Sequence, residues 1–280
     1  MKASRSTANF LRFALGAASL LPALAWANGA TWTEPRTGMA FTRMAKGCYA
    51  MGVADDQPAR EEGYIYARRV ANEMPAHEVC LDEFWIGRFE VTEAQWQTLI
   101  GTPRRPVGPG HPVTGISWQE AQTFARRLSE ISDKGDQFRL PTEAEWEYAC
   151  RAGEPASSGP PYTDEIAGKA WFSFHYEKKT GERHASVHPV GTRQANAAGL
   201  HDMLGNAWEW VQDSYRDDAY RLHARRNPVI EQDGAARAIR GGGFRTARHF
   251  IRCAARAWQD GATQTDTIGF RLVRIPRGEK

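Results

Sequence analysis

The sequence predicts a mixed α/β domain with little regular secondary structure, long ordered loops and a core built on aromatic side chains. Glycine and proline punctuate the chain heavily, as in residues 103–112 and 154–162, and both residue types interrupt helices and strands. The chain has ten tryptophans in 280 residues, and a buried indole ring removes a large apolar area from water. Capping patterns and short apolar runs, rather than long periodic stretches, mark the regular elements.

Three helices are predicted from a hydroxyl residue followed three positions later by Glu or Gln. In this pattern the hydroxyl accepts a backbone N–H and the longer side chain accepts the N–H of the capping residue. The three pairs are Thr92 with Gln95, Ser117 with Glu120, and Thr142 with Glu145. The second pair begins the clearest helix, since apolar residues follow at helical spacing through about residue 131. Strands are expected at residues 40–44, 79–89, 238–242 and 269–274.

The N-terminus is typical of a secretory signal peptide. Lys2, Arg5 and Arg12 precede an apolar stretch at residues 13–24, which ends in the small-x-small pattern before residue 28. An uncleaved membrane anchor is the alternative, but the apolar run is shorter than the roughly 20 residues that cross a bilayer. We expect cleavage after Ala27 and a periplasmic or secreted protein without a stable membrane span.

The charge pattern argues against a nucleic-acid partner. The predicted signal peptide carries three cations and no anions, so its removal brings the formal charge of +3 to about zero. The remainder has no basic cluster interleaved with aromatic residues, as nucleic-acid binding requires. The paired arginines are interpreted as solvated surface: Arg104 and Arg105, Arg126 and Arg127, Arg225 and Arg226.

The four cysteines of the chain predict two structural disulfides. Their number is even and the chain is expected to be exported, which places them in an oxidising compartment. A zinc site or a redox dithiol is the alternative, but the sequence contains no CxxC pair. The mature chain of about 250 residues has no internal repeat and no Ser/Gly-rich linker, which favours one domain.

Four sequence blocks carry a resemblance to a known family. They are residues 84–92, the string RLPTEAEWEYA at 139–149, the string GLHDMLGNAWEW at 199–210, and RGGGF at 240–244 with GFR at 269–271. In this order the blocks resemble the formylglycine-generating enzyme, or sulfatase-modifying factor, family. The resemblance implies a C-type-lectin-like irregular α/β fold. It divides the chain into a signal peptide at 1–27, an N-terminal extension at 28–38 and the family domain at 39–276.

The resemblance also implies calcium. Relatives that bind calcium use the positions of Asp202, Gly205, Ala207 and Glu209, partly through backbone oxygens, and some add the position of Glu90. Carboxylates and converging carbonyls are the hard oxygen ligands that calcium prefers. The alternative is that Asp202 and Glu209 cap a turn and pair with arginine, as Glu90 could also do. A further family calcium site usually needs an Asn that the segment 170–175 lacks.

Copper is not expected. The family oxidase holds copper through two cysteines between its RGG strand and its RCAAR segment, whereas residues 244–252 here contain none. Thiolate ligands suit Cu(I), and neither Thr nor Arg replaces them. The resemblance instead pairs Cys150 with Cys253, which leaves Cys48 with Cys80. The sequence does not specify a redox cofactor.

The same interval predicts a cationic, aromatic groove. It holds the candidate catalytic residues Arg245, Arg248, His249 and Arg252, with Trp258 nearby. Guanidinium and indole groups suit an anionic or aromatic ligand, and His249 is placed as a proton-transfer group. The alternative is that these arginines pair with acids of the loops. Histidines could hold a metal instead, and His175, His184, His188 and His201 are candidates. However, no histidines in the sequence form the metal-binding patterns HxH or HExxH.

Two functions remain open. The first is an exported oxidative maturation enzyme for a peptide- or siderophore-like substrate, by resemblance to the periplasmic pyoverdine-maturation branch, which is also exported and also lacks the copper cysteines. The second is a non-catalytic, calcium-stabilised binding module of the cell envelope. Formylglycine formation by another chemistry is a third possibility. Turnover distinguishes the first from the second, because a binding module forms no product.

Overall fold

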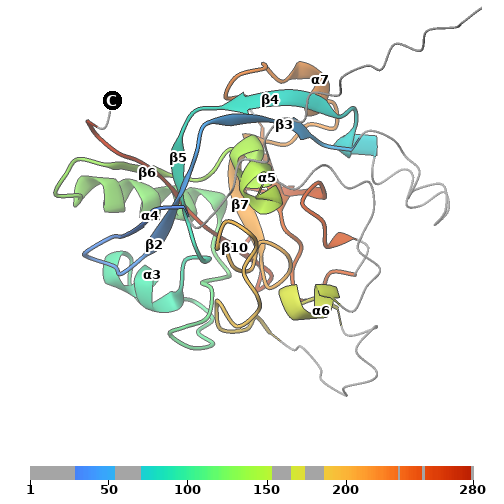
Figure 1. Cartoon of the computed structure of the whole chain (residues 1–280). Coiled ribbons are helices and arrows are strands. Elements are labelled where there is room, and N and C mark those ends of the chain that lie inside the picture. Colours follow the sequence, from blue (N-terminus) through green and yellow to red (C-terminus); the bar gives the residue numbers. More distant parts are fainter. Residues whose placement is uncertain are drawn as a thin grey trace, which may run out of the picture.

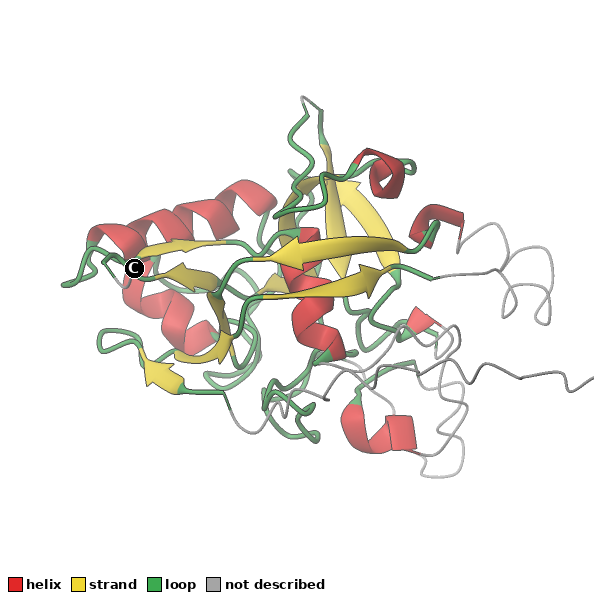
Figure 2. Ribbon diagram, turned by 45° about the horizontal axis from the view of Figure 1, so that its top comes forward, coloured by secondary structure: helices red, strands yellow, loops and turns green. Residues whose placement is uncertain are grey.

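The computed structural model describes residues 29–53, 71–152, 165–173, 186–232, 234–247 and 250–278. The predicted signal peptide and its cleavage site lie outside the described residues. None of the described helices is long and apolar enough to cross a membrane. Short strands and helices are connected by long ordered loops, as Figures 1 and 2 show, so the predicted mixed fold with little regular structure is confirmed.

A five-stranded sheet, in the order β1-β2-β5-β11-β6, forms one half of the domain. Its strands are β1 (Thr31–Thr33), β2 (Ala40–Met44), β5 (Phe84–Gly87), β11 (Val273–Ile275) and β6 (Gln137–Arg139), and all pair antiparallel. Strand β5 is buried along its whole length, as expected for a strand inside a sheet that is covered by helices.

A four-stranded sheet, in the order β10-β7-β8-β9, forms the other half and positions the candidate site. Its strands are β7 (Trp208–Ser214), β8 (Ala236–Arg240), β9 (Arg256–Asp260) and β10 (Ile268–Phe270). Only the pair of β10 with β7 is parallel among these described strands. A separate ribbon of β3 (Gly47–Met51) and β4 (His77–Leu81) crosses above helix α5 in Figure 1.

The three predicted helix starts are confirmed, each with a complete capping box. They begin α3 (Glu93–Leu99), α4 (Trp118–Glu130) and α5 (Glu143–Arg151). Helices α3 and α4 lie together beside β6 on one side of the molecule, opposite α6 (Glu165–Lys169), in Figure 1. The shorter elements are α7 (Ala219–Leu222) and the 3-10 turn η1 (Ala71–Glu73), which forms part of the candidate site.

Strands are found at the predicted positions 40–44 and near 238–242. Each of the other two predicted strands is divided into two strands. The expected strand at 79–89 is two strands, β4 and β5, because Asp82 and Glu83 are exposed and turn the chain from the ribbon into the five-stranded sheet. The expected strand at 269–274 is likewise split at Arg271. Residues before it pair with β7 and residues after it pair with β5 and β6, so this segment joins the two main sheets.

The core is built on aromatic rings, as the tryptophan content predicts. One cluster lies between the five-stranded sheet and α4, where Trp96 stacks on Phe124 at 5.6 Å and Phe270 meets both edge-on. A second cluster surrounds α5 and includes the fully buried Trp146. Offset and edge-on aromatic contacts add stability beyond area burial, which lets a loop-rich domain hold a fixed shape.

Candidate functional site

A cleft of about 610 Å³ opens beside the four-stranded sheet, with residues of β7 and β9 in its lining. Gly241 and Gly242 adopt positive φ angles of 95° and 78°, so the chain leaves the sheet sharply and returns through β9. The lining side chains come from η1, β7, β9 and the segments on either side of residues 248–249. Sequence positions nearly two hundred residues apart therefore meet in one site.

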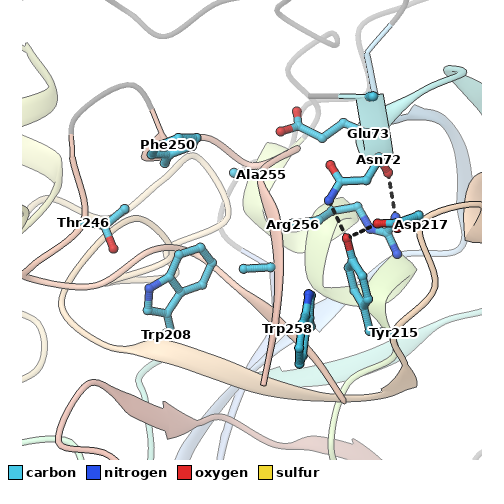
Figure 3. Close-up of a pocket in the computed structure, with 12 residues that line it drawn as sticks. Asn72, Glu73, Trp208, Tyr215, Asp217, Thr246, Phe250, Ala255, Arg256 and Trp258 are labelled. Atoms are coloured by element: carbon cyan, nitrogen blue, oxygen red, sulfur yellow. Dashed lines mark hydrogen bonds between the residues drawn. The ribbon is translucent and has the colours of Figure 1, made fainter. Parts of the chain in front are cut away.

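The sides of the cleft are aromatic. Figure 3 shows Trp208, Trp258 and Tyr215 along one side, with Phe250 and Ala255 along the other. The Tyr215 and Trp258 rings lie 6.2 Å apart, and Trp258 is 54% exposed although it is a large apolar residue. An exposed indole at the edge of an aromatic cleft is a feature of ligand sites, because it offers apolar area that a ligand can cover.

One end of the cleft is polar. The amide nitrogen of Asn72 donates to the Tyr215 hydroxyl at 2.7 Å, and that hydroxyl donates to the Asp217 carboxylate at 2.7 Å. Burial raises the pKa of Tyr215 to about 12, and the bond to Asp217 adds to this while the bond from Asn72 opposes it. The Asn72 side-chain oxygen is buried and has no hydrogen-bond partner among the described residues.

The described arginines of the predicted groove are paired with acids. Arg252 is buried and donates to both oxygens of Glu73, each at 2.6 Å, which fixes η1 as a wall of the cleft. Arg245 is not among the residues that line the cleft, and it pairs with Asp266 at 3.2 Å. Of the two alternatives for these two arginines, the structure shows pairing with loop acids. Arg248 and His249 lie outside the described residues, so their predicted roles stay predictions.

Arg256, which sequence reasoning did not select, anchors the polar end. Its guanidinium donates to both oxygens of Glu143, at 2.6 and 2.8 Å, and to the Asn72 backbone carbonyl at 2.6 Å. Glu143 and Arg256 are fully buried side chains at 0% exposure. Removing one partner of such a buried ion pair is strongly destabilising. The pair therefore fixes the position of Asn72 beside β9.

A buried charge network supports this end from below. Glu147 accepts from Arg240 and from Arg151, and the Tyr220 hydroxyl donates to it at 3.0 Å. Burial alone would raise the pKa of Glu147, but the two guanidinium groups outweigh it and lower the pKa to about 2. In contrast, burial and the neighbouring Glu143 raise the pKa of Asp213 to about 7. The network therefore joins α5, β7 and β8 beneath the cleft.

The predicted calcium residues lie together in a second, fully buried place. Glu90, Asp202 and Glu209 are 0 to 3% exposed, and Arg271 from the GFR segment is the guanidinium among them. Burial raises the pKa of Glu90 well above its usual value, with further contributions from Asp202 and Glu209. Burial also raises the pKa of Asp202. Three carboxylates share one arginine, which is an electrostatically unfavourable arrangement.

The side chains of this cluster fit calcium only poorly in the described arrangement. Arg271 donates to both oxygens of Glu209, at 2.7 Å at the shortest, and the Trp146 indole donates to the same carboxylate at 2.8 Å. Glu90 accepts from the Asn206 side chain and the Ala207 amide instead of pairing with an arginine. Across the described residues, no three His, Cys, Asp or Glu side chains are placed to hold one metal ion. The calcium site stays a prediction.

Close packing of the backbone requires a glycine at position 205, in the turn that carries these residues. Gly205 has a φ angle of 81°, and an added Cβ would lie 2.1 Å from the Trp171 carbonyl oxygen. Asn206 follows at a φ angle of 61° and accepts the His188 amide at 2.8 Å. The GNA segment is thus required for close backbone packing, whether or not a metal binds.

All four cysteines are used in disulfides. Cys48 bonds Cys80 and Cys150 bonds Cys253, which confirms both pairings that the family resemblance implies. No free thiol is left to form the dithiolate site of a copper oxidase, so the residues present do not fit that cofactor. The residue at the RGG end of the cleft is Thr246, whose hydroxyl accepts the Gly243 amide at 2.9 Å.

The described histidines do not converge on the cleft. His188 stacks on Trp171 at 3.6 Å, and a ring nitrogen of His201 lies 2.9 Å from the Arg193 carbonyl oxygen. His175 and His184 lie outside the described residues. Among the cleft residues that sequence reasoning missed are Asn72, Glu73, Trp208 and Tyr215, which come from three parts of the chain without a shared motif. Trp208 and Tyr215 had one local signal, the density of aromatic residues around 208–215, whereas Asn72 and Glu73 had none.

The comparison with solved structures identifies the class of fold. The structure of PvdO from Pseudomonas aeruginosa superposes with a TM-score of 0.73 at 25% identity, covering 88% of this chain and 98% of that one. The Treponema denticola variable protein 1 superposes with a TM-score of 0.68 at 23% identity, covering 88% of this chain and 99% of that one. The fold is the C-type-lectin-like fold of the formylglycine-generating enzyme type.

The chain belongs to the family of the sulfatase-modifying factor enzyme 1-like domain, whose sequence model matches residues 32–276. It is 32% identical over 201 residues to the formylglycine-generating enzyme of Streptomyces coelicolor, covering 68% of this chain. The chain spans 60% of the length of that enzyme and 35% of the length of the Chlamydia pneumoniae protein kinase pkn1, to which it is 29% identical over 72% of its own length. Family membership and the fold are thus shown independently.

Proposed function

We propose that this chain is an exported enzyme that oxidatively matures a peptide- or siderophore-like substrate in the aromatic cleft. The observation that carries this proposal is the cleft itself, which combines a volume of about 610 Å³, aromatic sides and a polar end. Small-molecule sites usually have this size and this mixture of apolar walls with a few placed polar groups. We place an aromatic chromophore or side chain of the substrate against Trp208, Trp258 and Phe250, which line the cleft.

The two disulfides support the export part of the proposal. Disulfides persist in the periplasm and outside the cell, and this chain uses every cysteine it has in them. The charged and apolar pattern of residues 1–27 supports the same location. The siderophore-like substrate is supported by the sequence resemblance to the exported pyoverdine-maturation branch.

The proposed oxidation differs from that of a copper formylglycine-generating enzyme. With all cysteines in disulfides, the chain supplies no thiolate pair for Cu(I), and the cleft presents Thr246 near the RGG turn instead. Removing two electrons and two protons from the substrate requires an acceptor, for which we propose dioxygen, which takes up both electrons and both protons and leaves as hydrogen peroxide. The protein's own contribution is to bind and orient the substrate and to exclude water from it.

Mass spectrometry of a reduced siderophore precursor tests the proposal. The purified mature protein, given the precursor and dioxygen, should produce a species that has lost one pair of hydrogens. Trp258→Ala should slow this conversion, whereas Leu222→Ala should not, because Leu222 is 52% exposed and does not line the cleft. Equal rates in the two variants would show that the chemistry takes place elsewhere.

A non-catalytic binding module is the second candidate. It is favoured by one observation, that the described cleft holds polar groups but no free thiol and no described histidine. The precursor would then bind with a stoichiometry of one and be recovered unchanged under dioxygen. Product formation that depends on Trp258 would rule this candidate out.

A further inference from the structure

Among the described residues that line the cleft, the charge is negative once the ion pairs are accounted for. Glu73 is neutralised by Arg252, and Arg256 is neutralised by Glu143. Asp217 lines the same cleft and is exposed, and it makes no ion pair within the described part of the chain. The described lining therefore presents one uncompensated carboxylate and no uncompensated cation.

The orientation of the Asn72 amide gives the cleft a second acceptor. The Tyr215 hydroxyl has a single proton, and it donates that proton to Asp217 at 2.7 Å. The Asn72 atom that lies 2.7 Å from the same hydroxyl must therefore be the nitrogen, which donates. Within the described part of the chain this leaves the Asn72 oxygen without a partner, and Figure 3 shows it turned away from Tyr215.

The Asn72 side-chain oxygen and the Asp217 carboxylate lie close together, because the side chains of both residues bond the Tyr215 hydroxyl. A buried amide oxygen without a partner is costly, and a ligand N–H that reaches it removes this cost. The Arg256 bond to the Asn72 backbone holds this acceptor in place, so the ligand does not have to order it.

The aromatic sides of the cleft also favour a positively charged ligand. The faces of Trp and Phe rings carry negative electrostatic potential and attract cations within about 6 Å. A flat cation can stack on an indole face while its N–H groups point along its own plane toward the acceptors. Trp258, exposed and adjacent to Tyr215, provides such a face beside the polar end.

We propose that the polar end of the cleft binds a planar cation of the amidinium or guanidinium class, with its face on Trp258 and its N–H groups directed to Asn72 and Asp217. This inference rests on the proposed function only in taking the cleft as the substrate site. It names the chemical group by which the substrate is recognised, and it replaces the anionic ligand expected from the sequence with a cationic one.

Three probes of one shape and three charges test the inference: benzamidine, benzamide and benzoate at neutral pH. Isothermal titration of the full mature protein should show saturable binding of benzamidine, weaker binding of benzamide and none of benzoate. Asp217→Asn should weaken benzamidine binding about tenfold, since it removes one charge-assisted hydrogen bond. Asp133→Asn serves as the matched control, because Asp133 is also an exposed acid but lies outside the cleft lining.

The outcomes separate this inference from the proposed function. Tighter binding of benzoate than of benzamidine, no binding of benzamidine, or an unchanged affinity in Asp217→Asn would overturn the inference. Folding of each variant is checked by its melting temperature relative to Asp133→Asn. If benzamidine binds as expected but no precursor is oxidised, the inference holds and the enzymatic proposal fails. If the precursor is oxidised while Asp217→Asn binds benzamidine normally, the enzymatic proposal holds and the inference fails.

Discussion

Replacing Arg252 by methionine should leave the Glu73 carboxylate buried without its partner. The two side chains are 5% and 2% exposed and are joined by two contacts of 2.6 Å. Breaking a buried ion pair from one side costs about 3–5 kcal/mol, because the remaining charge stays desolvated. In a domain of this size 1 kcal/mol shifts the melting temperature by about 2–4 °C, so Arg252→Met should lower it by about 6–20 °C.

Urea unfolding of the oxidised protein, followed by circular dichroism, measures the free energy of unfolding. The double variant Glu73→Met with Arg252→Met removes both charges and should recover most of the loss. Arg126→Met is the matched control: Arg126 is 63% exposed in a helix pair with Glu130, so its loss should cost less than about 1 kcal/mol.

The comparison decides what Arg252 does. If Arg252→Met is as stable as Arg126→Met, or if the double variant is no more stable than the single one, the ion pair does not hold η1 in place. If the expected losses are found, Arg252 positions the wall of the cleft and does not contact the substrate.

Three other perturbations have definite expected results. Burial lowers the pKa of His223 from 6.5 to about 4, so the unfolded state binds more protons than the folded state between these pH values. The melting temperature should therefore rise with pH from about 4 to about 6.5, and His223→Asn should flatten that rise. Replacing Cys150 and Cys253 by serine should cost about 5 kcal/mol, against about 4 kcal/mol for Cys48 and Cys80, because the closed loops span 103 and 32 residues; the reverse order in urea unfolding would contradict the loop argument. Returning calcium after chelation should raise the melting temperature, and Asp202→Asn should abolish the rise; an unchanged melting temperature in the unsubstituted protein would refute the calcium prediction.

Local sequence signals predicted the helices well because each helix start depends on residues three positions apart. The box of Thr142 and Glu145 forms as expected, with the Glu145 amide donating to the hydroxyl at 3.1 Å. Strand β7 was missed because its buried face carries Glu209 and Asp213, which hide the usual apolar alternation. Their burial depends on partners far along the chain, such as Arg271, that a local pattern does not contain.

The candidate site was predictable only in part. The interval after the RGG segment led to Trp258, which lines the cleft, and the lack of a cysteine in residues 244–252 can be read from the sequence. The charge of the site could not be read in this way. Arg252 and Glu73 are 179 residues apart, and only the fold shows that the guanidinium neutralises an acid. Asn72 gave no signal, since its role comes from its geometry beside Tyr215.

The most direct test of the account is a single mass-spectrometric assay that contains both candidate substrates, with copper added and dioxygen present. The mature, non-reduced protein receives a reduced siderophore precursor together with a cysteine peptide of the sulfatase type. We expect the precursor to lose one pair of hydrogens while the peptide cysteine remains unchanged, because every cysteine of this chain is in a disulfide. Conversion of the peptide cysteine to the aldehyde, with the precursor untouched, would contradict it.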